Sequence, residues 1–376
     1  MPWSCPKSVE SALWTAARAR LPAHRLEAAA LESAVIARSR LYTSEREGLA
    51  TPVGDPSDLA ARALFFTVAD APKASFALAE LAGRGLLPAS TPLRVLDLGA
   101  GAGAMTFGVW SFLRGAGDQR RIEVTAIDRD RAALAIMEEA AGILDPDGLA
   151  VTTWPVDLTA RDAVDARDTF DLVLAGTTLN ELDPPARRAL VDLALHSITP
   201  EGAVILIEPA LRDQSRALHE LRDQLLRDRA AFVFAPCTRQ SAPCPALADP
   251  EDWCHEDRPA ALPSRAAVIA RATGLRQHGI KFAYLTLRHA AAAQVPAPEP
   301  PLVALRVVSH SRRSKGVREA FLCGDQGRDR VRLLKRHRSP SNRAFEDAAR
   351  GDCLVMPATT DIAPTDPIER HRVDHE

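Results

Sequence analysis

An alternation of short apolar runs with helical segments, from Pro92 to His289, constrains the fold more than any other feature of this sequence. Each apolar run has the length of a buried strand, and the segments between them have helical spacing. The strand-like runs are RVLDLGAG, IEVTAID, VTTWPVDL, FDLVLAG, AVILIEP, AFVFAP and IKFAYLTL. Strands that alternate with helices predict an α/β fold with a doubly wound, mostly parallel sheet.

Different kinds of sequence flank this sheet. Residues 8–50 and 58–86 have the apolar spacing of helices, and Asp55–Pro56–Ser57 is a start signal for the second of them. On the other side, LVALRVVSH, REAFLCG and RVRLLKRH are typical of short strands, beyond a linker rich in Ala and Pro. We therefore predict a helical N-terminal region over 1–88, the sheet domain over 89–289, a linker over 290–301, a small basic β-rich domain over 302–360 and a disordered tail over 361–376.

The sequence carries no signal for a membrane or for secretion. No uncharged apolar run approaches the ~20 residues that a membrane-spanning helix needs. The start, MPWSCPKSVESALW, lacks the apolar region of a signal peptide. We therefore expect a cytoplasmic protein with no membrane partner. Its thiols would stay reduced, and clustered cysteines would bind metal or take part in chemistry rather than form disulfides.

The positive charge is concentrated near one end of the chain. From Arg306 to Arg338 there are 11 Lys or Arg residues against 3 acidic ones, a net charge of +8. Because the net charge of the whole chain is −2, the remaining residues carry a net charge of −10. Such segregation predicts a polyanionic partner for that end. The alternative is a solvated surface in a protein that uses much arginine throughout.

A glycine-rich loop, Asp97–Gly103, follows the first strand and opens a helix from about Ala104. Glycine suits a backbone that turns tightly and approaches a ligand closely. The G-x-G-x-G spacing differs from the G-x-G-x-x-G of dinucleotide enzymes. The second strand ends in Asp128, placed to accept both ribose hydroxyls. The third ends near Asp157, where an adenine amino group could be bound.

This pattern resembles the class I methyltransferases over roughly Pro92 to His289. The resemblance implies a Rossmann-like domain that binds S-adenosylmethionine, with Asp97 orienting the loop. It implies that the cofactor site is lined by Gly99, Gly101, Gly103, Asp128 and Asp157. The alternative is a Rossmann-like domain that binds another nucleotide or has lost binding.

The loop after the fourth strand, GTTLNELDPP, lies on the side where a methyl acceptor would bind. It lacks the Asp/Asn-Pro-Pro-aromatic motif of enzymes that methylate amino groups of nucleic acids. Asn180 and Glu181 are its candidate catalytic residues, because Glu181 can take a proton or hold a substrate amine. Alternatively, both simply cap the next helix. We do not expect Cys237 to act as the nucleophile of an RNA cytosine-C5 methyltransferase, because it follows the sixth strand.

Three of the six cysteines lie within 18 residues of one another, in an insertion over 236–258, namely Cys237, Cys244 and Cys254. A four-coordinate metal site needs one more ligand. Cys323 in the basic domain is the candidate, with His255 and His219 as nearer alternatives. Four thiolates suit either Zn²⁺ or an iron–sulfur cluster. The plain alternative is a loop of unligated cysteines. We expect no role for Cys5 and Cys353.

The order of these features resembles the methyltransferase-like proteins of the small ribosomal subunit, found in bacteria and mitochondria. The resemblance covers most of the chain and rests on DLGAGAG, LNEL, the PC…PCP…WC stretch, and a basic segment with VVSHSRRSKG and a further cysteine. It implies a part in small-subunit assembly. It also implies a [4Fe–4S] cluster on Cys237, Cys244, Cys254 and Cys323. This chain departs from the family in having Thr238–Arg239 where a histidine is frequent.

In such a protein the basic segment 306–338 would bind rRNA phosphates, which makes binding salt-dependent. We expect contacts from Arg312, Arg313, Lys315, Arg318, Arg332, Lys335, Arg336 and Arg338. Phe321 is the only aromatic residue of the segment, so recognition of backbone and shape is expected rather than base stacking. A cluster held from both sides of the linker would also lock the basic domain onto the core.

Three functions follow from these features. The first is an S-adenosylmethionine-binding methyltransferase of the small ribosomal subunit, acting on rRNA or a ribosomal protein. The second is a non-catalytic rRNA-binding assembly factor, and the third is a small-molecule methyltransferase with a structural zinc. The intact glycines and acids favour cofactor binding, whereas the weak acceptor motif favours the second function.

Overall fold

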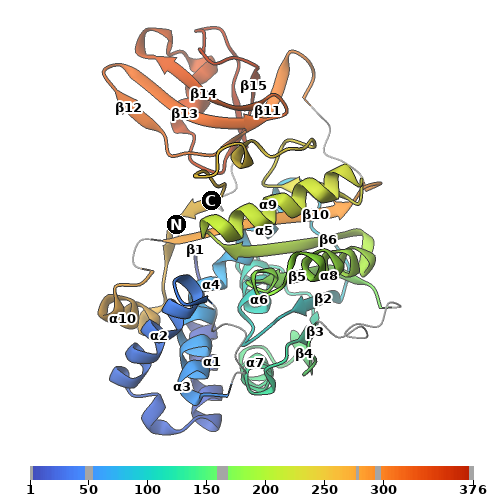
Figure 1. The fold of residues 1–376 in the computed structure, drawn as a ribbon, viewed down its shortest axis with the longest axis vertical. Coiled ribbons are helices and arrows are strands. Elements are labelled where there is room, and N and C mark those ends of the chain that lie inside the picture. Colours follow the sequence, from blue (N-terminus) through green and yellow to red (C-terminus); the bar gives the residue numbers. More distant parts are fainter. Residues whose placement is uncertain (1–2, 47–53, 159–167, 277–278, 293–297, 372–376) are drawn as a thin grey trace.

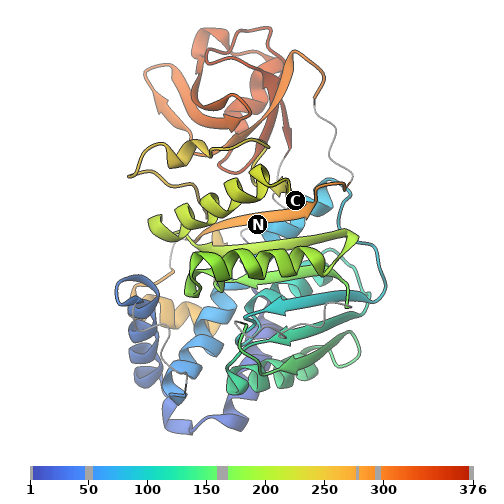
Figure 2. The same ribbon diagram turned by 45° about the vertical axis from the view of Figure 1, so that its right-hand side comes forward.

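The computed structural model describes residues 3–46, 54–158, 168–276, 279–292 and 298–371. Along the longest axis of the molecule, helices of the N-terminal region lie at the bottom, a large sheet in the middle and a β domain at the top (Figure 1). The cysteine-rich insertion, residues 236–258, lies between the sheet and the β domain (Figure 2). It therefore occupies the junction of the two domains.

The N-terminal region is built from short helices that cover one face of the sheet. They are α1 (Lys7–Arg20), α2 (Ala28–Thr43), α3 (Pro56–Ala61), α4 (Thr67–Asp70) and α5 (Pro72–Gly83), with single turns η1 (Ala23–Arg25) and η3 (Arg62–Phe66). The start signal is confirmed, because the Asp55 carboxylate accepts the N–H of Ser57 at 2.9 Å and caps α3. Residues 47–50 of the first predicted helical stretch lie outside the described residues.

The large sheet has the strand order β4-β3-β2-β5-β6-β10-β7. Its strands are β2 (Leu93–Leu98), β3 (Ile122–Ile127), β4 (Leu149–Trp154), β5 (Phe170–Gly176), β6 (Ile198–Pro209), β7 (Ala231–Ala235) and β10 (Ile280–His289). The first five in this order are parallel, and β10 runs antiparallel to both β6 and β7. This is the class I methyltransferase topology, a doubly wound Rossmann-like sheet, so the predicted fold class is confirmed. All seven strand-like runs of the sequence form these strands.

Helices cover both faces of the sheet. They are α6 (Ala104–Gly115), α7 (Arg131–Leu144), α8 (Pro184–His196), α9 (Arg212–Arg227) and α10 (Ser264–Thr273). Successive residues of a strand point to opposite faces. Val95 accordingly packs in a core shared with the N-terminal helices, α6 and α7, whereas Leu96 packs in the core beneath α8 and α9. Burial on both sides explains why these strands are near-continuous apolar runs.

Two small pairings complete this part of the chain. A short strand, β8 (Glu256–Arg258), pairs antiparallel with β10 at the end of the cysteine-rich insertion. The first described residues form β1 (Trp3–Ser4), which pairs in parallel with β9 (Ala260–Ala261). Among the described residues, none of the helices has both the length and the apolar character needed to cross a membrane.

The β domain is an antiparallel sheet around its own core. Its elements are β11 (Leu302–Val307), β12 (Arg312–Ser314), β13 (Val317–Gly324), β14 (Gly327–Leu334), β15 (Cys353–Pro357), β16 (Glu369–His371), η6 (Lys335–His337), η7 (Pro340–Asn342) and α11 (Arg343–Asp347). The core includes Leu322, Leu333, Phe345 and Met356. The predicted strands coincide with β11, β13 and β14. Residues 293–297 of the predicted linker lie outside the described residues.

The prediction of disorder from Asp361 onward is wrong for residues 361–371. Strand β16 pairs with β15, and the Asp361 carboxylate accepts two hydrogen bonds from Arg332, both at 3.0 Å. Ile362 and Ile368 are 0% and 6% exposed in the core of the β domain. Two isolated isoleucines therefore fix this polar segment on the β domain. The sequence did not indicate this order, because two isoleucines hardly raise the average hydrophobicity of the segment. Residues 372–376 lie outside the described part of the chain.

Candidate functional site

The glycine-rich loop joins β2 to α6 and is shaped by close packing. Gly99 has a φ of +72°, and a Cβ there would lie 2.3 Å from the Thr178 hydroxyl oxygen. A side chain at Gly101, with φ +52°, would meet only the Asp128 carboxylate, at 4.0 Å. The loop is therefore packed tightly on one side and open above Gly101. Gly103 follows with a φ of +91° at the start of α6.

Asp128 stands at the end of β3 beside this open space. One carboxylate oxygen, Oδ2, accepts the Gly101 N–H at 2.8 Å, and Oδ1 accepts the Asp130 N–H at 2.8 Å. Burial raises the pKa of Asp128, and these two backbone bonds oppose the rise. Each carboxylate oxygen can accept more than one hydrogen bond. The carboxylate is thus held in place and can still receive hydroxyl donors of a ligand.

Asp97 is buried at the base of the loop. Its Oδ2 accepts the Thr106 hydroxyl at 2.7 Å, which ties the end of β2 to α6. Its Oδ1 is buried and has no hydrogen-bond partner among the residues that the structure describes. Burial raises the pKa of Asp97 to about 7. An unsatisfied buried oxygen beside a glycine loop fits a ligand that brings a donor, such as an amino group.

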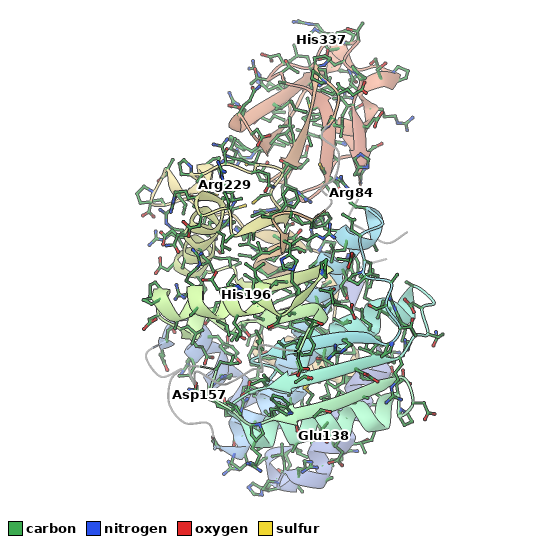
Figure 3. All side chains as sticks on the ribbon, turned by 90° about the vertical axis from the view of Figure 1, so that its right-hand side faces the viewer. Arg84, Glu138, Asp157, His196, Arg229 and His337 are labelled. Atoms are coloured by element: carbon green, nitrogen blue, oxygen red, sulfur yellow. The ribbon has the colours of Figure 1, made fainter. Side chains whose placement is uncertain are left out.

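Asp157 is exposed just beyond the end of β4, in the turn whose last described residue is Leu158. It lies in the lower half of the molecule, well away from the β domain (Figure 3). Asp97 is the penultimate residue of β2 and Asp128 directly follows β3, so all three predicted acids stand at the carboxyl ends of neighbouring parallel strands. Ligands of open α/β sheets bind at that edge.

The predicted acceptor loop forms a single turn, η4 (Leu179–Glu181). The side-chain oxygen of Asn180 accepts a hydrogen bond from Arg46 Nη2 at 2.7 Å. The Glu181 carboxylate lies 3.4 Å from Arg129 Nη2, and burial raises its pKa while Arg129 opposes the rise. Neither residue caps the following helix, because Asp183 accepts the N–H of Ala186 at 2.8 Å and caps α8. The capping alternative is therefore wrong.

Glu208 is a residue of this site that the sequence analysis did not select. It is 2% exposed near the end of β6, and its Oε1 accepts the Leu179 N–H at 2.9 Å. Burial raises its pKa to about 7, and a hydrogen bond from the Asn180 side chain opposes the rise. The signal was present in the sequence, since the run AVILIEP places an acid at the end of a buried strand.

Four cysteines line one small cavity at the junction of the domains, and they are Cys237, Cys244, Cys254 and Cys323. The first three belong to the insertion and the fourth to β13, so the two sides of the predicted linker meet here. The cavity measures about 30 Å³. No three metal-ligating side chains among the described residues lie close enough to hold an ion as they stand. A metal centre would therefore require the thiols to rearrange around it. Cys5 lies elsewhere, in the core that the N-terminal helices share with the sheet, and Cys353 lies in β15.

The cavity is electrostatically unusual. Burial, together with the neighbouring thiols, raises the pKa of Cys244 to about 11 and of Cys323 to about 12. Arg222 is 1% exposed beside Cys237 and Cys244, and Arg328 lies beside Cys254 and Cys323. The two guanidinium groups place positive charge beside the thiols, although each also pairs with a carboxylate, Asp223 and Asp252 respectively. The sequence analysis did not select these two arginines, because an arginine on a helix or strand is expected at the surface when its neighbours are unknown.

Both histidine alternatives also lie at the cavity. Burial lowers the pKa of His219 and of His255 to about 4 in each case, so both rings are neutral. His219 Nε2 lies 3.3 Å from the Cys254 carbonyl oxygen, and its Nδ1 has no partner among the described residues. His219 is therefore positioned by the insertion, while the four thiols form the set that converges from both domains.

Helix α9 holds the irregular insertion in place. Arg216 donates to the carbonyl oxygens of Asp249 at 2.7 Å and Asp252 at 2.8 Å. The Asp223 carboxylate accepts the N–H of Cys244 at 2.8 Å. These bonds satisfy backbone groups that have no strand or helix partner. They position the loop without regular secondary structure.

A buried ion pair fastens the β domain to the sheet domain. Arg306 is 4% exposed and donates to Glu80 Oε1 at 2.5 Å and to the Pro236 carbonyl oxygen at 2.6 Å. Tyr284 donates its hydroxyl to the same Glu80 oxygen at 2.9 Å. At the insertion, Thr238 donates its hydroxyl to the Cys323 carbonyl oxygen at 3.1 Å. The junction therefore joins α5, β10, the insertion and two strands of the β domain.

The basic segment is only partly on the surface. Arg318 is 6% exposed, so its predicted phosphate contact is wrong, and Arg306 is buried in the junction. Arg332 is paired with Asp361, and Arg338 Nε lies 3.0 Å from Glu346 Oε1. Five exposed cations of the segment are here called the basic tip, and they are Arg312, Arg313, Lys315, Lys335 and Arg336. The basic tip has two parts, residues 312–315 and residues 335–336. The Lys335 N–H donates to the Gly316 carbonyl oxygen at 2.7 Å, which joins them. Figure 3 shows the neighbouring His337 at the far end of the β domain.

Comparison with known structures finds methyltransferases of low sequence identity. A putative class I S-adenosylmethionine-dependent methyltransferase from Listeria monocytogenes is 12% identical, with a TM-score of 0.40 over 78% of this chain and 90% of that one. The magnesium protoporphyrin IX methyltransferase of Synechocystis, with bound S-adenosylmethionine, is 14% identical, with a TM-score of 0.36 over 68% of this chain and 95% of that one. No curated protein matches the sequence.

The family comparison covers most of the chain. The profile described as "Mitochondrial small ribosomal subunit Rsm22" matches residues 70–355. This span includes the glycine loop, the acceptor turn, the four cysteines at the junction and the basic tip. The chain belongs to the Rsm22 family.

Proposed function

We propose that this protein binds S-adenosylmethionine, associates with the small ribosomal subunit through rRNA, and acts in its assembly with a [4Fe–4S] cluster at the domain junction. One observation carries the proposal: four cysteines from both sides of the linker line one cavity in a chain of the Rsm22 family. The family description supports the ribosomal partner. It names the mitochondrial subunit, so the cytoplasmic location stays a prediction from the sequence.

The end of the sheet supports the cofactor. In the proposed site the open space above Gly101 receives the ligand, and Asp128 accepts the ribose hydroxyls. The free Oδ1 of Asp97 would accept a hydrogen bond from the amino group of the methionine part. Asp157 would accept a hydrogen bond from the adenine amino group. S-Adenosylmethionine would supply an electrophilic methyl group there. The chain's own contribution is to orient it, with Gly99 and Gly103 fixing the loop.

The donor set at the junction supports the cluster. Four thiolates suit iron–sulfur chemistry as well as zinc, and Arg222 and Arg328 suit an anionic centre. The proposed ligands are Cys237, Cys244, Cys254 and Cys323. Bound there, the group would supply a covalent link between the insertion and β13. It would act with the Arg306–Glu80 pair to fix the β domain on the core, so that the basic tip has a defined orientation.

Methyl transfer to rRNA or to a ribosomal protein is the second candidate function. The observation that favours it is Glu208, a buried carboxyl whose pKa is raised to about 7 beside Asn180. A group with that pKa can exchange a proton near neutral pH, as a general base must. Against it, Asn180 is engaged by Arg46 and Glu181 by Arg129, so the acceptor turn is occupied by its own contacts. The assembly function without catalysis therefore comes first.

Co-sedimentation with purified small ribosomal subunits tests the proposal. We expect the full-length protein to co-sediment at low salt and to be released as the salt concentration rises. Lys335→Ala/Arg336→Ala should lower the slope of log affinity against log salt by about 1 to 2, because each phosphate contact contributes ~0.7–0.9. Arg343→Ala is the matched control, an exposed cation of the same domain outside the basic tip.

Two outcomes would count against the proposal. If the protein does not sediment with small subunits at any salt concentration, the ribosomal function fails. If it sediments but Lys335→Ala/Arg336→Ala behaves like Arg343→Ala, the basic tip is not the contact. A small-molecule methyltransferase with structural zinc would give the first outcome, together with S-adenosylmethionine binding.

A further inference from the structure

A second pocket, of about 410 Å³, opens at the junction beside the four-cysteine cavity. Its volume lies in the range of pockets that bind small ligands or single nucleotide groups. Trp253 and His255 line it from the insertion, and Phe321 lines it from β13. Aromatic side chains from two domains thus face one space. The sequence did not reveal this because Trp253 and Phe321 are 68 positions apart in the chain.

The aromatic rings of the pocket are held in position. Trp253 and His255 stack with ring centroids 5.7 Å apart and an angle of 21° between the planes. The indole N–H of Trp253 donates to the Ala210 carbonyl oxygen at 3.1 Å. Phe321 is 43% exposed, and its backbone N–H donates to the Ser309 hydroxyl at 2.9 Å. The Phe321 ring is therefore accessible from the pocket.

The pocket is also positively charged. Four arginines line it against two acids, Asp252 and Glu319, so the formal charge of these six residues is +2. Arg328 pairs with Asp252, and Arg330 lies 3.9 Å from Glu319. Arg312 is exposed and belongs to the basic tip, so positive charge runs from the tip into the pocket. A polyanion bound along the tip would reach the aromatic rings.

We propose that this pocket seats an unpaired base of single-stranded RNA. The base stacks on the rings of Trp253 and Phe321, and the flanking phosphates lie against Arg312 and Arg330. Every base has a flat face that can stack on an aromatic ring, whereas a base inside a duplex is already stacked and out of reach. The inference rests on the proposed rRNA association and deepens it, because it assigns the contact to a loop or end of the RNA rather than to a helix.

Fluorescence anisotropy with the full-length protein tests the pocket. The probes are a labelled 12-nucleotide single-stranded RNA without secondary structure and a labelled 12-base-pair RNA duplex. Phe321→Ala should weaken binding of the single strand about 5- to 100-fold, the usual loss for one stacking partner, and leave duplex binding unchanged. Phe321→Tyr should restore single-strand binding. Val268→Ala is the matched control, an exposed apolar residue at 52% on α10, away from the junction.

A spectroscopic signature separates stacking from a structural role. Single-stranded RNA should quench the emission of Trp253, and Trp253→Phe should lose this quenching while it keeps most of the affinity. The pocket is refuted if Phe321→Ala binds the single strand like the wild type, or if it weakens the single strand and the duplex equally. If Lys335→Ala/Arg336→Ala still lowers the salt slope in that case, the proposed rRNA association stands without the pocket. If neither RNA nor small subunits bind the wild type, both proposals fail.

Discussion

The carboxyl end of the sheet and the domain junction are held together by different kinds of contact. At the sheet, the loop Asp97–Gly103 and Asp128 are fixed mainly by backbone N–H groups close to them, which donate to the Ile127 carbonyl oxygen and to the Asp128 carboxylate. At the junction, Arg306, Arg216 and Arg222 reach from regular elements to carbonyl and carboxylate oxygens far away in the sequence. One site is built by local geometry, and the other by long side chains.

This difference has a physical consequence. A backbone-built site persists as long as the sheet does, so changes within it alter ligand binding more than stability. A junction built on buried guanidinium groups depends on each partner, because a buried charge without its partner is costly. Variants at the two places should therefore fail in different ways.

The largest expected effect is at the junction. Arg306→Met leaves the Glu80 carboxylate buried without its cation, which should destabilise the protein by about 3–5 kcal/mol. Urea denaturation of the full-length chain measures the loss. Arg330→Met is the control, since its exposed pair with Glu319 should be worth no more than about 1 kcal/mol. A loss for Arg306→Met no greater than that of Arg330→Met would remove the distinction between the two regions.

A change at the sheet should act on the ligand instead. Asp128→Asn keeps the side chain's shape but removes its charge, so S-adenosylmethionine should bind about 10- to 100-fold more weakly, the usual value of one or two hydrogen bonds to a charged group. Isothermal titration calorimetry measures the affinity. Glu123→Gln, on the same strand and exposed to solvent, is the control. Unchanged affinity in Asp128→Asn would place the cofactor elsewhere or show that none binds.

Glu208 gives a smaller, pH-dependent effect. Its folded pKa is about 7, above its ordinary value of 4.5, so between these values the folded state holds a proton that the unfolded state has released. Its contribution to stability is complete below the ordinary value and declines as the pH rises through about 7. Glu208→Gln should flatten the fall in unfolding free energy between about pH 5 and 7, by up to about 1 kcal/mol per pH unit. Parallel curves for the two proteins would show that Glu208 is ionised throughout.

The sequence predicts one of the two regions far better than the other. Strand order, the glycine loop and the acid at the end of β3 follow from short-range patterns, because parallel strands carry apolar runs and their turns carry glycine. Cys323 could be linked to the insertion only through a family resemblance, since no spacing rule spans 69 residues from Cys254. The structure brings the two into one cavity.

The remaining errors share a cause. Arg306 and Arg318 read as surface cations but are buried, because a long side chain can be paired through tertiary contacts that composition does not record. Ile362 and Ile368 read as part of a polar tail but fill a core. Trp253 and Phe321 became a pair only once two domains were in contact. Each miss concerns a contact between segments distant in the sequence.

The central claim is tested most directly by measuring the content of iron, zinc and acid-labile sulfide in protein purified without oxygen. The same measurement is made on Cys323→Ser and Cys353→Ser. If one [4Fe–4S] cluster links the two domains, we expect about four iron ions and four sulfide ions per wild-type chain. Such a link predicts a marked loss in Cys323→Ser and wild-type content in Cys353→Ser, whose cysteine lies outside the cavity. Zinc alone, no metal, or equal iron content in wild type and Cys323→Ser would contradict a cluster held from both domains.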